Sequence, residues 1–188
     1  MNSGVLAKSA KNSFKLLLLF FFVLLPGLDF FAQAQANWWY FGANAGLNFN
    51  PNPAPVAGGQ INTIEGVAAI SDAAGNRLFY TEGMRVWNRN HIQMPNGFGL
   101  LGSSSSTQSG VIVQRPGSNN IYYIFTADAQ AGPGGLRYSE VDMNLAAGFG
   151  DVTANKNILL YTPTTERVCA IRHCNNVDIC VLPHHWGT

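Results

Sequence analysis

Ile121-Tyr122-Tyr123-Ile124-Phe125 decides the fold, because this short stretch is apolar or aromatic at every position. A β-strand with one face in water alternates apolar and polar residues, so an unbroken apolar strand is expected to be covered on both faces. Turn-forming residues precede it at 116–120, and a second apolar run lies before them at 111–115. Two such runs around a cluster of Pro, Gly and Asn predict a β-hairpin.

The same plan occurs twice more in the chain. These further hairpins join residues 67–71 to 77–81 and residues 168–173 to 178–182. Additional strands are predicted at residues 84–88, 136–141 and 158–161. No segment after residue 36 sustains the period of a helix over three turns. The sequence therefore predicts an all-β domain over residues 37–188.

The spacing of the hairpins favours one all-β architecture over another. They begin at residues 67, 111 and 168, which gives spacings of 44 and 57 residues. Four strands in about 40–50 residues is the period of a propeller blade. We therefore predict a partial β-propeller of about three blades, each an antiparallel four-stranded sheet. A two-layer sandwich is the alternative, although it would leave the outer faces polar.

Residues 1–36 are predicted to form a helical signal peptide that is cleaved. Residues 16–25 are ten consecutive apolar residues, and a basic start precedes them at Lys8, Lys11 and Lys15. Small-x-small sites follow at Ala32-Gln33-Ala34 and Ala34-Gln35-Ala36. This order is the one that signal peptidase recognises, with cleavage expected after Ala36. A membrane anchor is the alternative, but a spanning helix needs about 20 apolar residues.

The composition narrows the expected partners. Charged residues make up only 11% of the chain, against about 25% in ordinary globular proteins. No basic stripe of the kind that binds nucleic acid is visible. No stable membrane span is expected after cleavage of the signal peptide. A surface glycan or a protein ligand is the expected partner, and the remaining blades are expected from a longer chain, because closed propellers use about four to eight.

Three cysteines lie close together near the end of the sequence: Cys169, Cys174 and Cys180. An exported protein can form disulfides, but an odd number leaves one thiol over. If Asn175-Asn176 is the hairpin turn, none of the three directly opposes another. A disulfide, a metal site with His173 and unpaired buried thiols all stay open at this point. The spacing matches no CxxC zinc pattern.

The remaining polar residues predict no catalytic, cofactor-binding or metal-binding site. His184 and His185 are adjacent, so in a strand they face opposite sides and cannot easily share one ion. Glycoside hydrolysis would need two facing carboxylates, and the sequence does not show its candidates converging. Those candidates are Glu65, Glu82 and Glu140. Asp72 is interpreted as a turn residue whose carboxylate caps backbone amides.

The aromatic residues have two interpretations. They are predicted mainly as core residues, because aromatic side chains bury large areas. The alternative is a platform on which a glycan stacks. The residues in question are Trp38, Trp39, Trp87 and Trp186, with Tyr122 and Tyr123.

Several blocks of sequence resemble a known family. They are residues 37–42 (NWWYFG), 70–72 (ISD), 75–83 (GNRLFYTEG), 86–91 (VWNRNH), 94–97 (MPNG) and 135–142 (GLRYSEVD). Together they look like the N-terminal regions of gliding-motility-associated exported proteins, the cargo of type IX secretion. The resemblance implies a propeller-like region, often followed by immunoglobulin-like repeats and a C-terminal sorting domain. Cys180 and Pro183 stand where the family more often has an aromatic and a hydroxyl residue.

The resemblance and the residues together lead to one functional expectation. The chain is expected to be a non-enzymatic propeller module for adhesion or interaction, at the cell surface or outside the cell. It would be periplasmic if no sorting domain follows. A carbohydrate-active propeller enzyme is the alternative, and a truncated fragment without function is a third reading.

Overall fold

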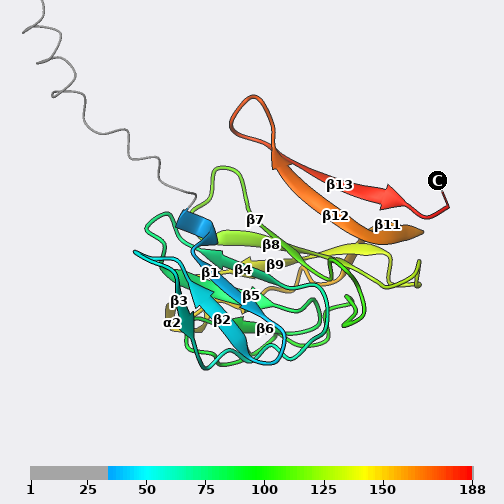
Figure 1. Ribbon diagram of the computed structural model, residues 1–188. Helices are drawn as coiled ribbons and strands as arrows, with labels where there is room; N and C mark the ends of the chain where they lie inside the picture. The colour runs from blue at the N-terminus through cyan, green and yellow to red at the C-terminus, as the bar shows by residue number, and fades with distance from the viewer. Residues whose placement is uncertain (1–33, 188) are drawn as a thin grey trace, which may run out of the picture. The chain divides into compact units, whose positions relative to one another are not determined.

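The computed structural model describes residues 34–187 (Figure 1). The predicted signal peptide lies outside the described residues, except for a 3₁₀ helix, η1 (Ala34–Ala36). The strands before residue 100 are β1 (Trp38–Phe41), β2 (Ala45–Asn48), β3 (Ala54–Val56), β4 (Ala68–Ser71), β5 (Arg77–Thr81) and β6 (Val86–Asn88). The later ones are β7 (Val111–Gln114), β8 (Ile121–Ala127), β9 (Leu136–Asp142), β10 (Asp151–Val152), β11 (Ile158–Tyr161), β12 (Thr164–Arg172) and β13 (Ile179–His185). One short helical turn, α2 (Leu145–Gly148), follows β9. The described chain is therefore all-β, as predicted, and no helix in it is long and apolar enough to cross a membrane.

The strands form four antiparallel sheets that follow one another along the chain. The first sheet has the order β1-β2-β3 and the second β4-β5-β6. The third has the order β10-β9-β8-β7, with β11 also paired to β9, and the fourth is the β12–β13 hairpin. All three predicted hairpins are confirmed. The expectation of four strands in each sheet is wrong, because the sheets contain three, three, five and two strands.

The turn between β4 and β5 shows how local chemistry fixes a hairpin. Asp72 Oδ1 accepts hydrogen bonds from the backbone N–H groups of Ala74 and Asn76, each at 2.9 Å. Gly75 has a φ of +84°, a left-handed conformation that glycine adopts without strain. The interpretation of Asp72 as a capping turn residue is confirmed.

Each sheet packs against the next through an apolar layer. Between the first and second sheets, the rings of Tyr40 and Tyr80 stack with centroids 4.4 Å apart. Between the second and third, Phe79 and Tyr122 meet edge to face at 5.5 Å. Buried Val168 of the fourth sheet packs with residues of the third. The first strands of the four sheets also contact one another in chain order, β1 with β4, β4 with β7, and β7 with β12.

Strand β8, the run that decided the fold, is covered unequally on its two faces. Tyr122 and Ile124 are buried against the second sheet. Tyr123 and Phe125 point to the other face and are only half-buried. The two-stranded fourth sheet is too narrow to cover that whole face. The prediction of two covered faces therefore holds fully on one side and in part on the other.

Within residues 34–187, one face of the fourth sheet is uncovered. The register pairs Cys169 with Leu182 and Ile171 with Cys180, so these four side chains share one side of the hairpin. Ile171 and Leu182 are each about half exposed. Among the described residues, strand β13 pairs with β12 alone, so Pro183 lies in an edge strand, where its missing N–H donor is tolerated. We refer to these four residues as the outer face of the hairpin.

Candidate functional site

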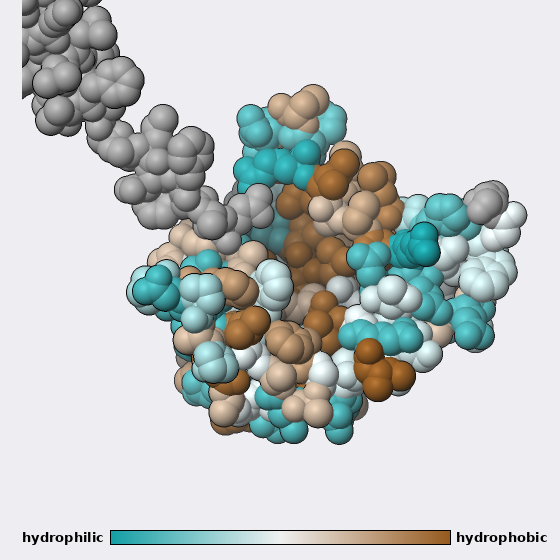
Figure 2. Space-filling view, in the orientation of Figure 1, coloured by the Kyte–Doolittle hydropathy of each residue, from teal (hydrophilic) through white to brown (hydrophobic). Residues whose placement is uncertain are grey.

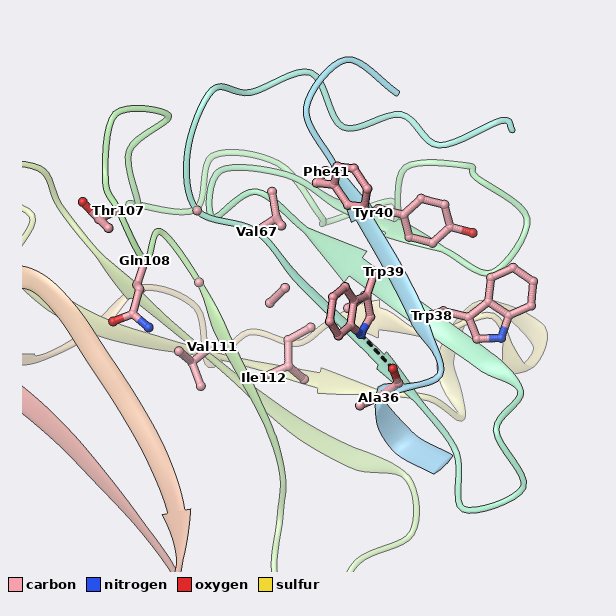
Figure 3. A pocket seen from close by; sticks show the side chains of 14 residues that line it. Ala36, Trp38, Trp39, Tyr40, Phe41, Val67, Thr107, Gln108, Val111 and Ile112 are labelled. Atoms are coloured by element: carbon pink, nitrogen blue, oxygen red, sulfur yellow. Dashed lines mark hydrogen bonds between the residues drawn. The ribbon is translucent and has the colours of Figure 1, made fainter. Parts of the chain in front are cut away.

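A groove of about 590 Å³ lies against the first strands of the first three sheets (Figure 3). The space-filling view shows apolar side chains gathered in a hollow beside the β12–β13 hairpin (Figure 2). The groove is lined by Ala36, residues 38–41 of β1, residues 66–69 at β4, and Thr107, Gln108, Gly110, Val111 and Ile112 at β7. We call it the first-strand groove.

Strand β1 presents two aromatic side chains to this groove because side chains alternate along a strand. Trp39 is 51% exposed and Phe41 is 39% exposed. Tyr40 and Trp38 point to the opposite side, away from the groove (Figure 3). The indole N–H of Trp39 donates to the backbone carbonyl of Ala36 at 2.9 Å, which fixes the orientation of the ring.

The opposite wall combines aliphatic side chains with a polar loop. Val111 and Ile112 come from β7 and are half-buried. The loop that carries Thr107 and Gln108 is fastened to β12. The backbone N–H and the hydroxyl of Thr107 both donate to the Glu166 carboxylate at 2.9 Å. The backbone N–H of Val168 donates to the side-chain oxygen of Gln108 at 3.0 Å.

The same loop is also held by close contacts with the backbone at Gly66 and Glu82. The Ser109 hydroxyl donates to the Glu82 carbonyl at 2.7 Å and also to the Gly66 carbonyl. A Cβ atom at Gly66 would lie 2.4 Å from the backbone nitrogen of Ser109, so only glycine fits there. The groove wall is therefore a rigid part of the sheet stack.

The chemistry of the first-strand groove suits binding. Apart from Tyr40, which points away, its lining residues include no acid, base or cysteine. Aromatic and aliphatic side chains with a few polar groups are typical of ligand pockets. An exposed indole and phenyl ring can stack on an apolar face of a sugar or a peptide side chain.

The carboxylates considered in the sequence have separate surroundings. Glu82 is fully buried, and its Oε1 accepts from Arg85 Nε at 2.9 Å, while its Oε2 has no hydrogen-bond partner in the part of the chain that the structure describes. Burial raises the pKa of Glu82, and the hydrogen bond and charge of Arg85 partly offset this. Glu140 accepts from the hydroxyl of Thr153 and the amide of Asn155. Glu65 is exposed.

The cysteine and histidine candidates do not assemble into a site. Cys169, Cys174 and Cys180 are free thiols, and no cysteine opposes another across the hairpin, as the predicted turn implied. Cys169 and Cys174 are exposed and Cys180 is partly buried, so the interpretation of the three as mostly buried thiols is wrong. Cys169 lies on the outer face of the hairpin, which no residue of 34–187 covers, and Cys174 lies in the hairpin turn. Within residues 34–187, no group of three or more His, Cys, Asp and Glu side chains could hold a metal ion.

The tryptophans divide between the two interpretations. Trp87 is buried and Trp38 is packed beside the core, whereas Trp39 and Trp186 are about half exposed. The sequence analysis did not identify Phe41, Val111 or Ile112 as site residues. The alternation of Trp39, Tyr40 and Phe41 could have indicated that two of these aromatics share a face. No family model, curated protein or solved structure matches the chain, so the resemblance to gliding-motility-associated proteins stays a prediction.

Proposed function

We propose that this chain is an exported, non-enzymatic module of partial β-propeller architecture, used for adhesion or interaction. Its partner is a surface glycan or a protein ligand, and its place is the cell surface or the extracellular space. The resemblance to gliding-motility-associated proteins, the cargo of type IX secretion, supports the export and the location.

The order of the sheets supports a propeller more than a sandwich. A sandwich has two packed layers, whereas here four sheets pack in succession, each against its neighbour along the chain. Their first strands also contact one another in sequence. In a propeller the innermost strands of consecutive blades surround a central channel. The first-strand groove lies where that channel would be.

The observation that carries the binding function is the pair of exposed aromatics, Trp39 and Phe41, that faces the first-strand groove (Figure 3). Large exposed apolar surfaces in a groove with a polar rim mark interaction sites. The alternative, a carbohydrate-active enzyme, draws no support from the carboxylates. Glu82 and Glu140 contact different residues and Glu65 is exposed. None of the three lines the groove.

Binding of the full chain to a glycan and protein array tests the proposal, with Trp39→Ala as the variant. Trp186→Ala is a matched control, because Trp186 is 47% exposed and lies outside the groove. We expect a ligand whose signal falls at least about tenfold in Trp39→Ala, since loss of an aromatic hot spot costs about 2 kcal/mol or more. An array on which the chain binds nothing overturns the proposal, and so does equal loss in the two variants.

A further inference from the structure

A second, smaller pocket of about 250 Å³ lies where the first and second sheets meet. Unlike the first-strand groove, its lining is mainly polar and cationic. Its side chains are Trp38, Asn50, Asn76, Arg77, Arg89 and Asn90. Trp38 is the one lining residue that the two sites have in common, and its indole points away from the groove (Figure 3).

The guanidinium of Arg77 is held rigidly at this pocket. It lies 4.7 Å from the centroid of the Trp38 ring and 5.4 Å from that of Tyr40. It donates to the Tyr40 hydroxyl and to the backbone carbonyl of Arg89. Its Nε is buried and has no hydrogen-bond partner among residues 34–187. A cation whose position is fixed by these contacts therefore lies at the pocket.

Arg89 also lines this pocket. The Arg89 guanidinium lies over the Phe149 ring at 4.6 Å. Neither arginine has a carboxylate within 4.0 Å, because in the described chain the one ion pair joins Glu82 to Arg85. The nearby Asp72 carboxylate is occupied by its own turn, where it accepts from Ala74 and Asn76.

The absence of a compensating acid is costly for two neighbouring cations. Arg77 and Arg89 are both partly buried, and removing a guanidinium from water without a counter-charge is unfavourable. The positive charge of Arg77 acts on a neighbouring side chain. Burial, and to a smaller extent the charge of Arg77, hold the pKa of His91 below its usual value. An anion bound in the pocket would supply the missing counter-charge.

We propose that this pocket binds a sugar unit that carries a carboxylate. Guanidinium groups match carboxylates in a two-pronged geometry, and the amides of Asn50, Asn76 and Asn90 can both donate to and accept from sugar hydroxyls. The volume lies below the range of about 300–1,000 Å³ that is usual for drug-sized ligands. A single sugar unit is the matching size. This site is independent of the first-strand groove, because none of its charged residues lines that groove.

The test is a titration of the full chain with glucuronate, followed by calorimetry or by NMR, with glucose and inorganic phosphate as comparison probes. Glucuronate is expected to bind about 10- to 100-fold more tightly than glucose, the difference that charge-assisted hydrogen bonds provide. Arg89→Gln is expected to bind glucuronate about 10- to 100-fold more weakly than the wild type. Arg115→Gln is the matched control, because Arg115 lies in the β7–β8 turn, away from this pocket.

Each outcome decides the proposal. No glucuronate binding, or binding that Arg89→Gln leaves unchanged, overturns it. Phosphate binding as tightly as glucuronate also overturns it, since the pocket would then be a general anion site. Arg89→Lys keeps the positive charge but lacks the planar guanidinium. A loss of glucuronate affinity smaller than that of Arg89→Gln therefore supports a carboxylate that accepts two parallel hydrogen bonds from Arg89. Trp39→Ala leaves glucuronate binding unchanged, which separates this site from the first-strand groove.

Discussion

Substitution of Gly66 by alanine tests whether the tight backbone packing under the first-strand groove holds the loop in place. The new Cβ would lie 2.4 Å from Ser109 N and 2.8 Å from both Gln108 Cα and Thr107 O. All three neighbours are backbone atoms, which cannot move without displacing the loop. Overpacking of this kind costs about 1–3 kcal/mol. We expect the upper end of that range for Gly66→Ala, about 3 kcal/mol.

Gly110→Ala is the matched control in the same groove. Its Cβ would lie 3.3 Å from the Thr81 Cγ2 methyl, with every other neighbour at 3.8 Å or more. A side-chain methyl can shift, and alanine reduces the entropy of the unfolded chain. The change in the free energy of unfolding is therefore expected to stay within about 1 kcal/mol.

Urea unfolding followed by tryptophan fluorescence measures the difference. With a slope of about 1–3 kcal/mol per molar urea, a loss of about 3 kcal/mol lowers the midpoint by about 1–3 M. Because the loop also carries Thr107 and Gln108, groove binding is expected to weaken in Gly66→Ala even where the protein stays folded. The reasoning is refuted if Gly66→Ala and Gly110→Ala unfold at the same urea concentration.

Three further predictions follow from the packing. Ile124→Ala is expected to lower the free energy of unfolding by about 2–5 kcal/mol, because the side chain is fully buried, whereas Ile92→Ala at an exposed position changes it by less than about 0.5 kcal/mol in the same urea titration. Glu82 has a raised pKa in the folded state, so its stabilising contribution is present below its ordinary value of 4.5 and is lost as pH rises through the raised value. In thermal melts at stepped pH, the unfolding temperature of the wild type should therefore fall relative to that of Glu82→Gln as the pH rises above 4.5. Unfolding temperatures that change in parallel with pH in the two proteins would contradict this. Ile171→Lys on the outer face of the hairpin is expected to reduce concentration-dependent light scattering with little change in the unfolding temperature, whereas Val177→Lys in the hairpin turn serves as the control and should leave the scattering unchanged.

One hairpin in each of the second, third and fourth sheets could be predicted because its signals are local. Each hairpin joins two apolar runs through a short turn, and at Asp72 the side chain that forms the turn is evident from its neighbours. The pairing of β11 with β9, in contrast, spans an intervening β10, so nothing in either strand alone indicates it.

The first sheet could not be predicted in the same way. The strands β1 to β3 are separated by Asn, Gly and Pro residues, and two of them contain Gly or Pro. Gly46 lies within β2 because a Cβ there would come 2.9 Å from the Tyr40 ring. A glycine required by a neighbouring strand looks, in the sequence alone, like a break in a strand.

The candidate sites depend on contacts that the sequence does not show. Arg77 and Arg89 are twelve residues apart, and the fold brings the Arg77 guanidinium to the backbone carbonyl of Arg89, to which it donates a hydrogen bond. The first-strand groove likewise needs β1, β4 and β7 to lie together. Spacing along the chain indicates which residues form hairpins, and only the packing of whole sheets shows which surfaces they share.

The chain-order succession of the sheets has a consequence for how the chain folds as it emerges with its N-terminus first. Each sheet is built from strands that emerge one after another, so its pairing is complete before the next sheet begins. Loop closure within a sheet is short, and its entropic cost is correspondingly small. The polypeptide can thus acquire its structure progressively from the N-terminal side, with each new sheet laid on a surface that already exists.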